Sequence, residues 1–299
     1  MRFLVLGAGG MAGHMIALRL AEKGHNIVGL ARRRLTFCDT IVHDIADTEF
    51  LQAEIVAGGY DAVVNAVGIL PNAIVADLAK SIWINAYFPH WLARATAGLP
   101  TKVIHLSTDC VFSGHESGGY AEGSFRSADD AYGRSKALGE LNDEKNLTFR
   151  TSIIGPDINE SGVGLFHWFM GQSAAVTGYS RAIWTGVTTL VLADAIEAAA
   201  KQNLSGLYHL VNGQTIAKDK LLRLFNAARR EPISIAQSDT YVSDKSLINT
   251  RSDFDFAVPP YDEMVKDLIG WISAHHELYP HYLPVIRSLH KEETDGCNR

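Results

Sequence analysis

The sequence predicts an α/β protein in which a doubly wound parallel sheet is followed by a smaller C-terminal α/β substrate lobe. In the first half of the 299-residue chain, short apolar runs alternate with longer runs that have helical periodicity. Strands without polar alternation, separated by helices, are typical of a parallel sheet covered on both faces. After about Gly155 the pattern becomes irregular, with glycine-containing turns between helical stretches. We therefore expect a first domain over residues 1–155 and a mainly substrate-binding lobe over 156–299, with some strands or helices returning to the first domain.

The expected elements follow from local apolar patterns, taken in chain order. Apolar runs of four to seven residues are assigned to strands and longer periodic runs to helices. The predicted strands span residues 3–6, 26–30, 61–67 and 102–107, and the predicted helices span residues 11–23, 73–97, 131–141, 190–201, 218–229 and 261–275.

The composition excludes several classes of protein. With 27 basic and 33 acidic residues and a formal net charge of −6, the chain lacks the basic surface expected of a nucleic-acid-binding protein. The most apolar window, residues 189–200, contains two acidic residues and is too short to span a bilayer. The three cysteines lie far apart, no histidine or acidic cluster has the spacing of a metal site, and the N-terminal residues lack a leader pattern. We expect a cytoplasmic protein with no membrane, nucleic-acid or metal partner.

A glycine-rich turn joins the first predicted strand to the first predicted helix. The run GAGGMAG at residues 7–13 fits G-x-x-G-x-x-G through Gly7, Gly10 and Gly13, and it also fits G-x-G-x-x-A. Glycines at these positions permit a tight turn and let the backbone N–H groups at the helix N-terminus approach a pyrophosphate. The context predicts a Rossmann-like dinucleotide-binding domain, whereas a tight turn without a ligand is the alternative.

The end of the second predicted strand indicates which dinucleotide is bound. An acidic residue there would bond the adenosine ribose of NAD, but the chain has Arg32, Arg33 and Arg34 instead. Guanidinium groups can form bidentate bonds with a 2′-phosphate, so NADP(H) is favoured over NAD(H). Two alternatives stay open: NAD(H) as the cofactor, and a solvated basic turn that binds no phosphate. Asp44, after the expected third strand, is a candidate ligand of the adenine amino group, although a plain loop aspartate fits as well.

Two further features predict a site for proton transfer. Tyr132 and Lys136 are four residues apart and would share one face of a helix. A free tyrosine has a pKa of about 10, and we expect Lys136 and an oxidised nicotinamide to lower that pKa. Ser107 and Thr108 come at the end of a predicted strand, where ligands bind in open parallel sheets.

These motifs together resemble the extended short-chain dehydrogenase/reductases and, within them, the dTDP-4-dehydrorhamnose reductase (RmlD-like) family. The resemblance covers nearly the whole chain. Besides the glycine motif, it rests on STDCVF at residues 107–112, AYGRSKALGE at 131–140, NAVG at 65–68, the helix asparagine at 85, WTGVTT at 184–189 and NTRS at 249–252.

The resemblance implies an NADPH-dependent reductase of a 4-keto-6-deoxy nucleotide sugar. Tyr132 is the implied general acid, Lys136 lowers its pKa and holds the nicotinamide ribose, and Thr108 bonds the keto oxygen. The expected cofactor-binding residues are Gly7, Gly10, Met11, Gly13, Arg32, Arg33, Asp44, Ile45, Asn65, Ala66, Val67, Asn85, Ser107, Tyr132 and Lys136. The expected substrate-binding residues are Val67, Thr108, Ile153, Trp184 and Arg251.

The chain departs from the family at three positions near the expected site. Cys110, Ser113 and Ile153 stand where the family often has tyrosine, aspartate and a tryptophan near the substrate. Dehydratases of the superfamily have Asp-Glu after the threonine, whereas here Asp109 is followed by Cys110, which favours reduction or epimerisation. The alternatives are an epimerase or reductase for another nucleotide sugar, and a non-catalytic NADP-binding regulatory subunit like the β subunit of methionine adenosyltransferase. The resemblance also suggests a homodimer.

Overall fold

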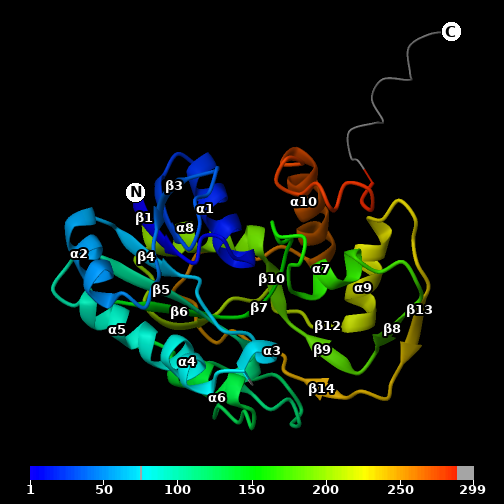
Figure 1. Cartoon of the computed structure of the whole chain (residues 1–299). Coiled ribbons are helices and arrows are strands. Elements are labelled where there is room, and N and C mark those ends of the chain that lie inside the picture. Colours follow the sequence, from blue (N-terminus) through cyan, green and yellow to red (C-terminus); the bar gives the residue numbers. More distant parts are fainter. Residues whose placement is uncertain (75, 288–299) are drawn as a thin grey trace.

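The computed structural model describes residues 1–74 and 76–287, and its centre is a seven-stranded sheet (Figure 1). The strands of this sheet are β1 (Arg2–Leu6), β2 (Asn26–Ala31), β3 (Asp39–Val42), β4 (Ala62–Asn65), β5 (Lys102–Ser107), β6 (Leu147–Arg150) and β11 (Gly206–His209). Their order is β11-β6-β5-β4-β1-β2-β3, and every neighbouring pair is parallel. The order reverses between β1 and β4, as in dinucleotide-binding sheets. The predicted doubly wound parallel sheet is confirmed.

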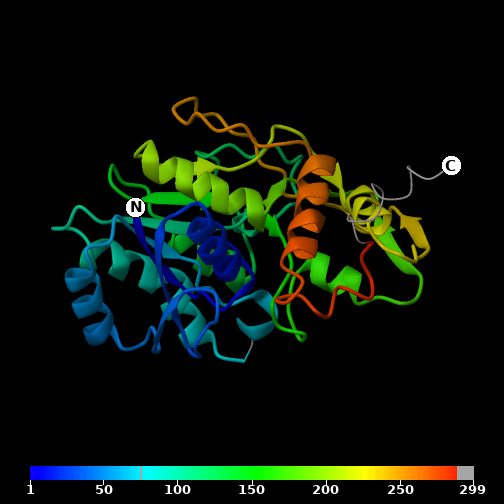
Figure 2. The same ribbon diagram turned by 90° about the horizontal axis from the view of Figure 1, so that it is seen from above.

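Helices cover both faces of this sheet because successive strand residues point to opposite sides. Phe3 and Val5 of β1 belong to one buried cluster, and Leu4 and Leu6 belong to another. Helices α1 and α8 lie on one side of the sheet, and α2 and α5 lie on the other (Figures 1 and 2). The bounds of these helices are α1 (Met11–Glu22), α2 (Thr48–Gly58), α5 (Phe88–Ala95) and α8 (Thr189–Lys201).

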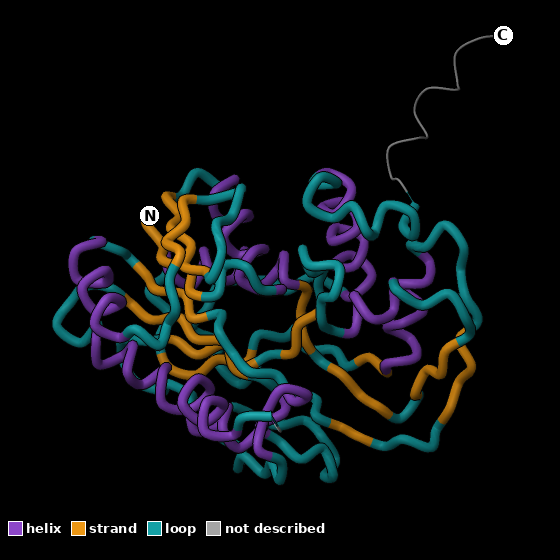
Figure 3. Tube along the Cα trace, viewed as in Figure 1, coloured by secondary structure: helices purple, strands orange, loops and turns teal. Residues whose placement is uncertain are grey.

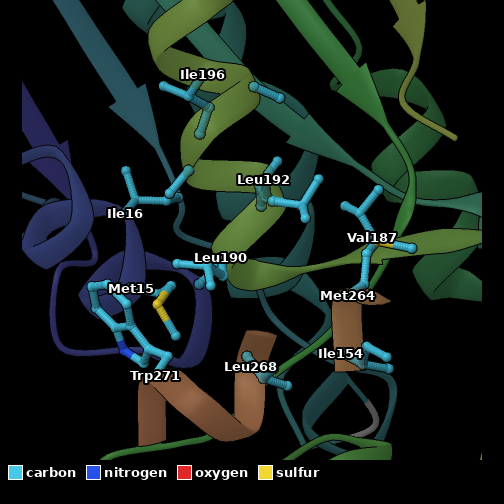
Figure 4. Packing of buried hydrophobic residues seen from close by; sticks show 14 of the residues in the cluster. Met15, Ile16, Ile154, Val187, Leu190, Leu192, Ile196, Met264, Leu268 and Trp271 are labelled. Carbon is cyan, nitrogen blue, oxygen red and sulfur yellow. The ribbon is translucent and has the colours of Figure 1, made fainter. Parts of the chain in front are cut away.

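The larger cluster continues from α1 and α8 into the C-terminal part of the chain. Figure 4 shows Met15 and Ile16 of α1 beside Leu192 of α8, with Trp271 and Leu268 close by. The last two residues belong to α10 (Tyr261–Ala274). One continuous core therefore joins the main sheet to α10, the last helix of the described chain.

The single helix predicted over residues 73–97 is wrong. The chain forms α3 (Pro71–Ile74), α4 (Leu78–Ile82), a π-helical turn (Trp83–Tyr87) and then α5. Asp77 starts α4 because its carboxylate accepts the N–H of Lys80 at 2.9 Å. The π-helical turn stands directly before the first turn of α5, where Pro89 has no N–H with which to bond the carbonyl of Asn85.

The remaining elements form a smaller lobe beside the carboxyl ends of the main strands (Figure 3). Three small sheets pair β10 with β7, β9 with β12 and β14, and β13 with β8. Two elements that follow residue 155 return to the first domain: β11 belongs to the main sheet, and α8 packs on α1. The bounds are β7 (Ser152–Ile154), α7 (Leu165–Met170), β8 (Val176–Tyr179), β9 (Ala182–Trp184), β10 (Gly186–Thr188), β12 (Ile216–Ala217), α9 (Lys218–Ala227), β13 (Ile235–Ser238) and β14 (Ser243–Asp244).

A buried carboxylate, Glu140, joins the ends of β5 and β6 just after α6 (Ala131–Leu138). It accepts hydrogen bonds from Ser107 Oγ at 2.7 Å and from Arg150 at 2.7 and 2.6 Å, and Arg126 lies 3.0 Å away. Burial raises the pKa of Glu140, but the bonds with Arg150, Ser107 and Arg126 outweigh it and lower the pKa. Arg150 also donates to His209 of β11 at 2.8 Å.

Glu140→Gln is expected to lower the free energy of unfolding by about 3–5 kcal/mol, because Arg150 would become an uncompensated buried charge. Urea unfolding monitored by circular dichroism measures this change. The pKa of Glu140 is lowered in the fold, so its stabilisation is present above the unfolded pKa and is lost as pH falls through the folded pKa. The difference between the two proteins should therefore shrink on acidification.

The matched control is Glu144→Gln, the same chemical change at an exposed position. It should alter stability by no more than about 0.5 kcal/mol. Equal unfolding midpoints for the two variants would contradict a central role for Glu140.

Candidate active site

The glycine turn has the close packing that a dinucleotide site requires. Gly7 has a φ of +78°, and the N–H of Gly10 bonds its carbonyl at 3.0 Å. A Cβ at Gly13 would lie 2.1 Å from that same carbonyl oxygen, so α1 approaches the turn as closely as only glycine permits. Gly10 caps α1 without a side-chain bond, which leaves the N–H groups of the first turn available to an anion. The turn therefore fits a pyrophosphate, and Met11 lies beside it against Gly164 of the second lobe.

The three arginines lie exposed directly after β2. Arg33 donates a hydrogen bond to Asn159, and both residues line a surface pocket together with residues 158–161. A basic turn at this position fits the 2′-phosphate end of an adenosine. Residues 158–161 of the second lobe therefore lie beside the basic turn after β2.

Asp44 and Ile45 follow β3. Asp44 is exposed, and its Oδ1 accepts the N–H of Ala46 at 2.9 Å, which leaves Oδ2 for a ligand. Ile45 is partly buried against the cluster on the α2 side of the sheet. The adenine contact expected for Asp44 stays a prediction.

The turn after β4 lies directly beside the glycine turn. A Cβ on Gly7 would be 3.0 Å from the side chain of Val67 and 3.3 Å from the backbone of Ala66. Asn65 is fully buried, and its Oδ1 accepts the N–H of Val67 at 3.2 Å. These residues therefore line the same edge as the pyrophosphate site.

Two residues expected to contact the cofactor, Asn85 and Ser107, form hydrogen bonds with other groups of the protein. The amide of Asn85 exchanges hydrogen bonds with the backbone of Ile69 at 2.9 and 3.0 Å and donates to Ser135 at 3.2 Å. Ser107 donates its hydroxyl proton to Glu140. These bonds give both residues a positioning role: Asn85 ties the segment after β4 to α6, and Ser107 ties β5 to the Glu140 network. Their contact with the cofactor stays a prediction.

Thr108 and Tyr132 meet because α6 begins very close to the end of β5. Asp130 caps α6 by accepting the N–H of Gly133 at 2.7 Å. A Cβ at Gly133 would lie 2.1 Å from the carbonyl oxygen of Cys110, so the helix rests directly on the turn after β5. Tyr132 is thereby placed near enough to Thr108 for the threonine side chain to influence the pKa of the phenol. Lys136 lies one turn further along the same helix, as its spacing predicts.

In the protein alone the pKa of Tyr132 is raised, whereas the prediction from the sequence concerned the site with an oxidised nicotinamide bound. Burial of the phenol raises its pKa above the ordinary value, and electrostatic interactions with Cys110 and Asp109 add to this, while the side chain of Thr108 opposes it. The phenol therefore carries its proton at neutral pH in the protein alone.

Lys136 does not lower that pKa because its amine faces β5. Its Nζ donates to the carbonyl of Leu106 at 2.6 Å and lies 3.3 Å from Nε2 of His105. Burial lowers the pKa of Lys136 to about 8, against the attraction of Glu140. His105 was missed by the sequence analysis because an interior strand position gave no reason to expect a polar contact.

Ile153 and Trp184 differ in how well they fit a substrate contact. Ile153 lies in β7, just beyond the carboxyl end of β6, and is partly buried. Trp184 was expected in a loop but ends β9, where its ring is 6% exposed and packs against Tyr261 at 5.6 Å. The side chain of Trp184 is part of the core.

Arg251 lies at the wrong edge of the sheet for a substrate contact. Its guanidinium donates to the carbonyls of Ser205 and Leu207 at 2.7 and 2.9 Å and pairs with Asp253. Ser205 precedes β11, so this contact is at the amino ends of the strands, opposite the glycine turn. The prediction that Arg251 binds the substrate diphosphate is therefore wrong.

A second cation, Lys245, lies beside Gly114 in the segment after β5 and was not predicted from the sequence. Its aliphatic chain covers Gly114, whose Cβ would be 2.7 Å from Lys245 Cγ. Burial raises the pKa of the Cys110 thiol to about 12, and the charge of Lys245 opposes this rise. Lys245 follows β14, more than a hundred residues along the chain from Cys110, and no local pattern indicates that they meet.

Two other kinds of feature are absent from the part of the chain that the structure describes. Over residues 1–74 and 76–287, no helix is long and apolar enough to cross a bilayer. The same residues contain no group of three or more histidine, cysteine or acidic side chains that could hold a metal ion.

Comparison with curated proteins gives relatives along most of the chain. It is 32% identical over 231 residues to the dTDP-4-dehydrorhamnose reductase of Burkholderia thailandensis, covering 72% of this chain and 74% of that one. It is 30% identical over 251 residues to the enzyme of the same name from Shigella flexneri, covering 79% and 81%. A probable low-salt glycan biosynthesis reductase of Haloferax volcanii is 29% identical over 231 residues, covering 71% and 75%.

Solved structures share the fold. The dTDP-4-dehydrorhamnose reductase of Bacillus anthracis, in complex with NADP, matches with a TM-score of 0.76 and 18% identity over 90% of this chain and 99% of that one. The UDP-glucose 4-epimerase of Thermotoga maritima matches with a TM-score of 0.74 and 16% identity over 92% and 99%. The family described as RmlD substrate binding domain matches residues 1–240. The resemblance found in the motifs is thus confirmed, and the chain belongs to this RmlD substrate-binding domain family.

Proposed function

We propose that the protein is an NADPH-dependent reductase of a 4-keto-6-deoxy nucleotide sugar, of the dTDP-4-dehydrorhamnose reductase type, which supplies a dTDP-L-rhamnose-like precursor for polysaccharide synthesis. The observation that carries this proposal is the meeting of Thr108, Tyr132 and Lys136 at the carboxyl ends of the parallel strands, next to the glycine turn. The names of the relatives from Burkholderia and Shigella support the same substrate class.

The cofactor is assigned to the edge that the glycine turn and β2 form. The N–H groups at the start of α1 bind the pyrophosphate, Arg32 and Arg33 bind the 2′-phosphate, and Val67 packs beside the nicotinamide. NADPH, when bound, supplies the hydride. The protein holds the ribose through Lys136 and excludes water from the site.

The chain supplies the proton for the reduction. The keto oxygen accepts hydrogen bonds from Thr108 and Tyr132, which polarise the carbonyl. As the carbonyl carbon gains a hydride, negative charge develops on that oxygen, and the phenol of Tyr132 gives up its proton to form the new hydroxyl group. Thr108 reaches the oxygen by rotating the O–H that donates to Asp109 at 3.1 Å.

The names of the relatives favour reduction over the alternatives. Reduction needs a phenol that donates its proton, and Tyr132 carries that proton at neutral pH. A regulatory NADP-binding subunit would need no such constellation. The proposal includes a cytoplasmic location, in keeping with the free thiols of Cys38 and Cys110, and a homodimer.

Tyr132→Phe should lower kcat by about 10²–10⁴-fold, because the general acid is removed. The consumption of NADPH in the presence of dTDP-4-dehydrorhamnose measures kcat. NADPH binding, followed by fluorescence, should be unchanged, since the hydroxyl is absent but the ring remains. Full activity in the variant would rule out Tyr132 as the acid.

Arg33→Ala should weaken NADPH binding roughly ten- to a hundredfold, because a charged hydrogen bond contributes about 1.5–3 kcal/mol. NADH binding should change little, and the ratio of the two dissociation constants isolates the 2′-phosphate. Arg34→Ala, the neighbouring exposed arginine without an assigned contact, is the control. If the unmodified protein bound NADH as tightly as NADPH, the assignment of Arg32 and Arg33 would fail.

Lys245→Ala should raise the KM for the nucleotide sugar roughly tenfold or more, because we assign the substrate diphosphate to this cation rather than to Arg251. Arg251→Ala, the matched control, should lower thermal stability and leave KM unchanged. Steady-state kinetics at saturating NADPH separate the two variants. A raised KM for the Arg251 variant alone would reverse the assignment.

A further inference from the structure

Three buried polar side chains form a chain behind the proposed catalytic centre. Asn65 at the end of β4 has its Nδ2 3.1 Å from Nδ1 of His105, and Nε2 of the same ring is 3.3 Å from Nζ of Lys136. Asn65 and His105 are fully buried, and Lys136 is 5% exposed. Hydride transfer as described above makes no use of Asn65 or His105, although they sit between Lys136 and the turn that carries Val67.

The donors and acceptors of this chain restrict where protons can be. Asn65 Oδ1 accepts from the N–H of Val67, so its Nδ2 donates toward His105 Nδ1, which must then accept. A neutral imidazole carries one proton, which therefore lies on Nε2 and points at Lys136. An ammonium group has no lone pair with which to accept it. The observed arrangement is thus complete only when Lys136 is a neutral amine.

A charged Lys136 requires the opposite arrangement. Nε2 must then accept from the ammonium, the ring proton must lie on Nδ1, and Asn65 must turn its oxygen toward the ring. That rotation removes the acceptor from the N–H of Val67. The proton on Lys136 is therefore linked, through one imidazole ring and one amide, to the turn beside Gly7.

Burial keeps the ring neutral in both arrangements. Burial lowers the pKa of His105 well below its ordinary value of 6.5, and the charges of Lys136 and His90 lower it further. Burial lowers the pKa of Lys136 to about 8, and Glu140 is the charge that opposes this effect. The lysine rather than the histidine is the group that titrates near neutral pH.

We propose that His105 is a positioning residue, which holds the amine of Lys136 and couples its proton to the Asn65–Val67 turn at the cofactor edge of the sheet. The coupling itself needs only the protein. Its effect on turnover rests on the proposed reductase function.

Nitrogen NMR of the histidine rings tests the coupling in the intact protein without substrate. The ring of His105 should stay neutral, and its proton should move from Nδ1 to Nε2 as pH rises through about 8, the pKa of Lys136. The resonance is assigned by its loss in His105→Asn, and Lys136→Met should abolish the movement. One tautomer at every pH, or a second proton taken up near pH 6.5, would overturn the proposal.

A pair of variants tests the effect on turnover. His105→Gln can place its amide where Nε2 lies and keep the contact with Lys136, whereas His105→Asn reaches only Asn65. The ring of His105 donates to the neutral amine and accepts from the ammonium, so its loss removes a bond from both forms and changes the pKa of Lys136. The basic limb of the kcat profile should therefore shift by about one pH unit in His105→Asn, a tenfold change in proton affinity, and by much less in His105→Gln.

Other readouts separate the possible failures. Thermal unfolding and the KM for the nucleotide sugar report structural damage. Such damage would lower the activity of both variants without moving the basic limb of the kcat profile. That result would contradict the proposal. If the unmodified protein reduces no nucleotide sugar, the reductase function fails, while the NMR titration still decides the role of His105.

Discussion

The carboxylate of Glu140 holds together the parts of the chain on which the site depends. It receives Ser107 from the end of β5, Arg150 from the end of β6 and Arg126 from the loop before α6. Arg150 extends the network to His209 of β11, so four segments share one buried charge cluster. A buried ion pair of this kind tolerates no loss of one partner, because the remaining charge is left without compensation. The ends of β5 and β6 are thereby held in register with α6, which carries Tyr132.

Close backbone contacts complete what the charge cluster begins. At Gly13, α1 meets the glycine turn, and at Gly133, α6 meets the turn after β5, both at distances that exclude a side chain. These contacts bring a helix N-terminus suited to a pyrophosphate and a Thr108–Tyr132 pair to the same edge of the sheet. A hydride donor bound on the first would face a keto group held by the second. The fold thus brings both features to one edge, and burial raises the pKa of the Tyr132 phenol.

Much of this arrangement could be predicted from the sequence, because it depends on local patterns. β5 matches its predicted bounds, α1 and α10 differ from theirs by one residue, and the glycine turn, Thr108 and the Tyr132–Lys136 spacing follow from motifs a few residues long. What failed depends on contacts between distant residues. Arg251 is bound at the far edge of the sheet, and Lys136 faces His105 instead of lowering the pKa of Tyr132. The separate α3 and the π-helical turn before α5 were also not predicted, because the apolar pattern continues through both.

Transfer of the hydride itself is the most direct test of a reductase. The protein is incubated with dTDP-4-dehydrorhamnose and NADPH that carries deuterium at the transferable position, and the product is examined by mass spectrometry and NMR. We expect one deuterium on the sugar carbon that carried the keto group, together with loss of the label from the cofactor. Tight NADPH binding without any transfer to this or other 4-keto nucleotide sugars would contradict a catalytic role and favour an NADP-binding regulatory protein.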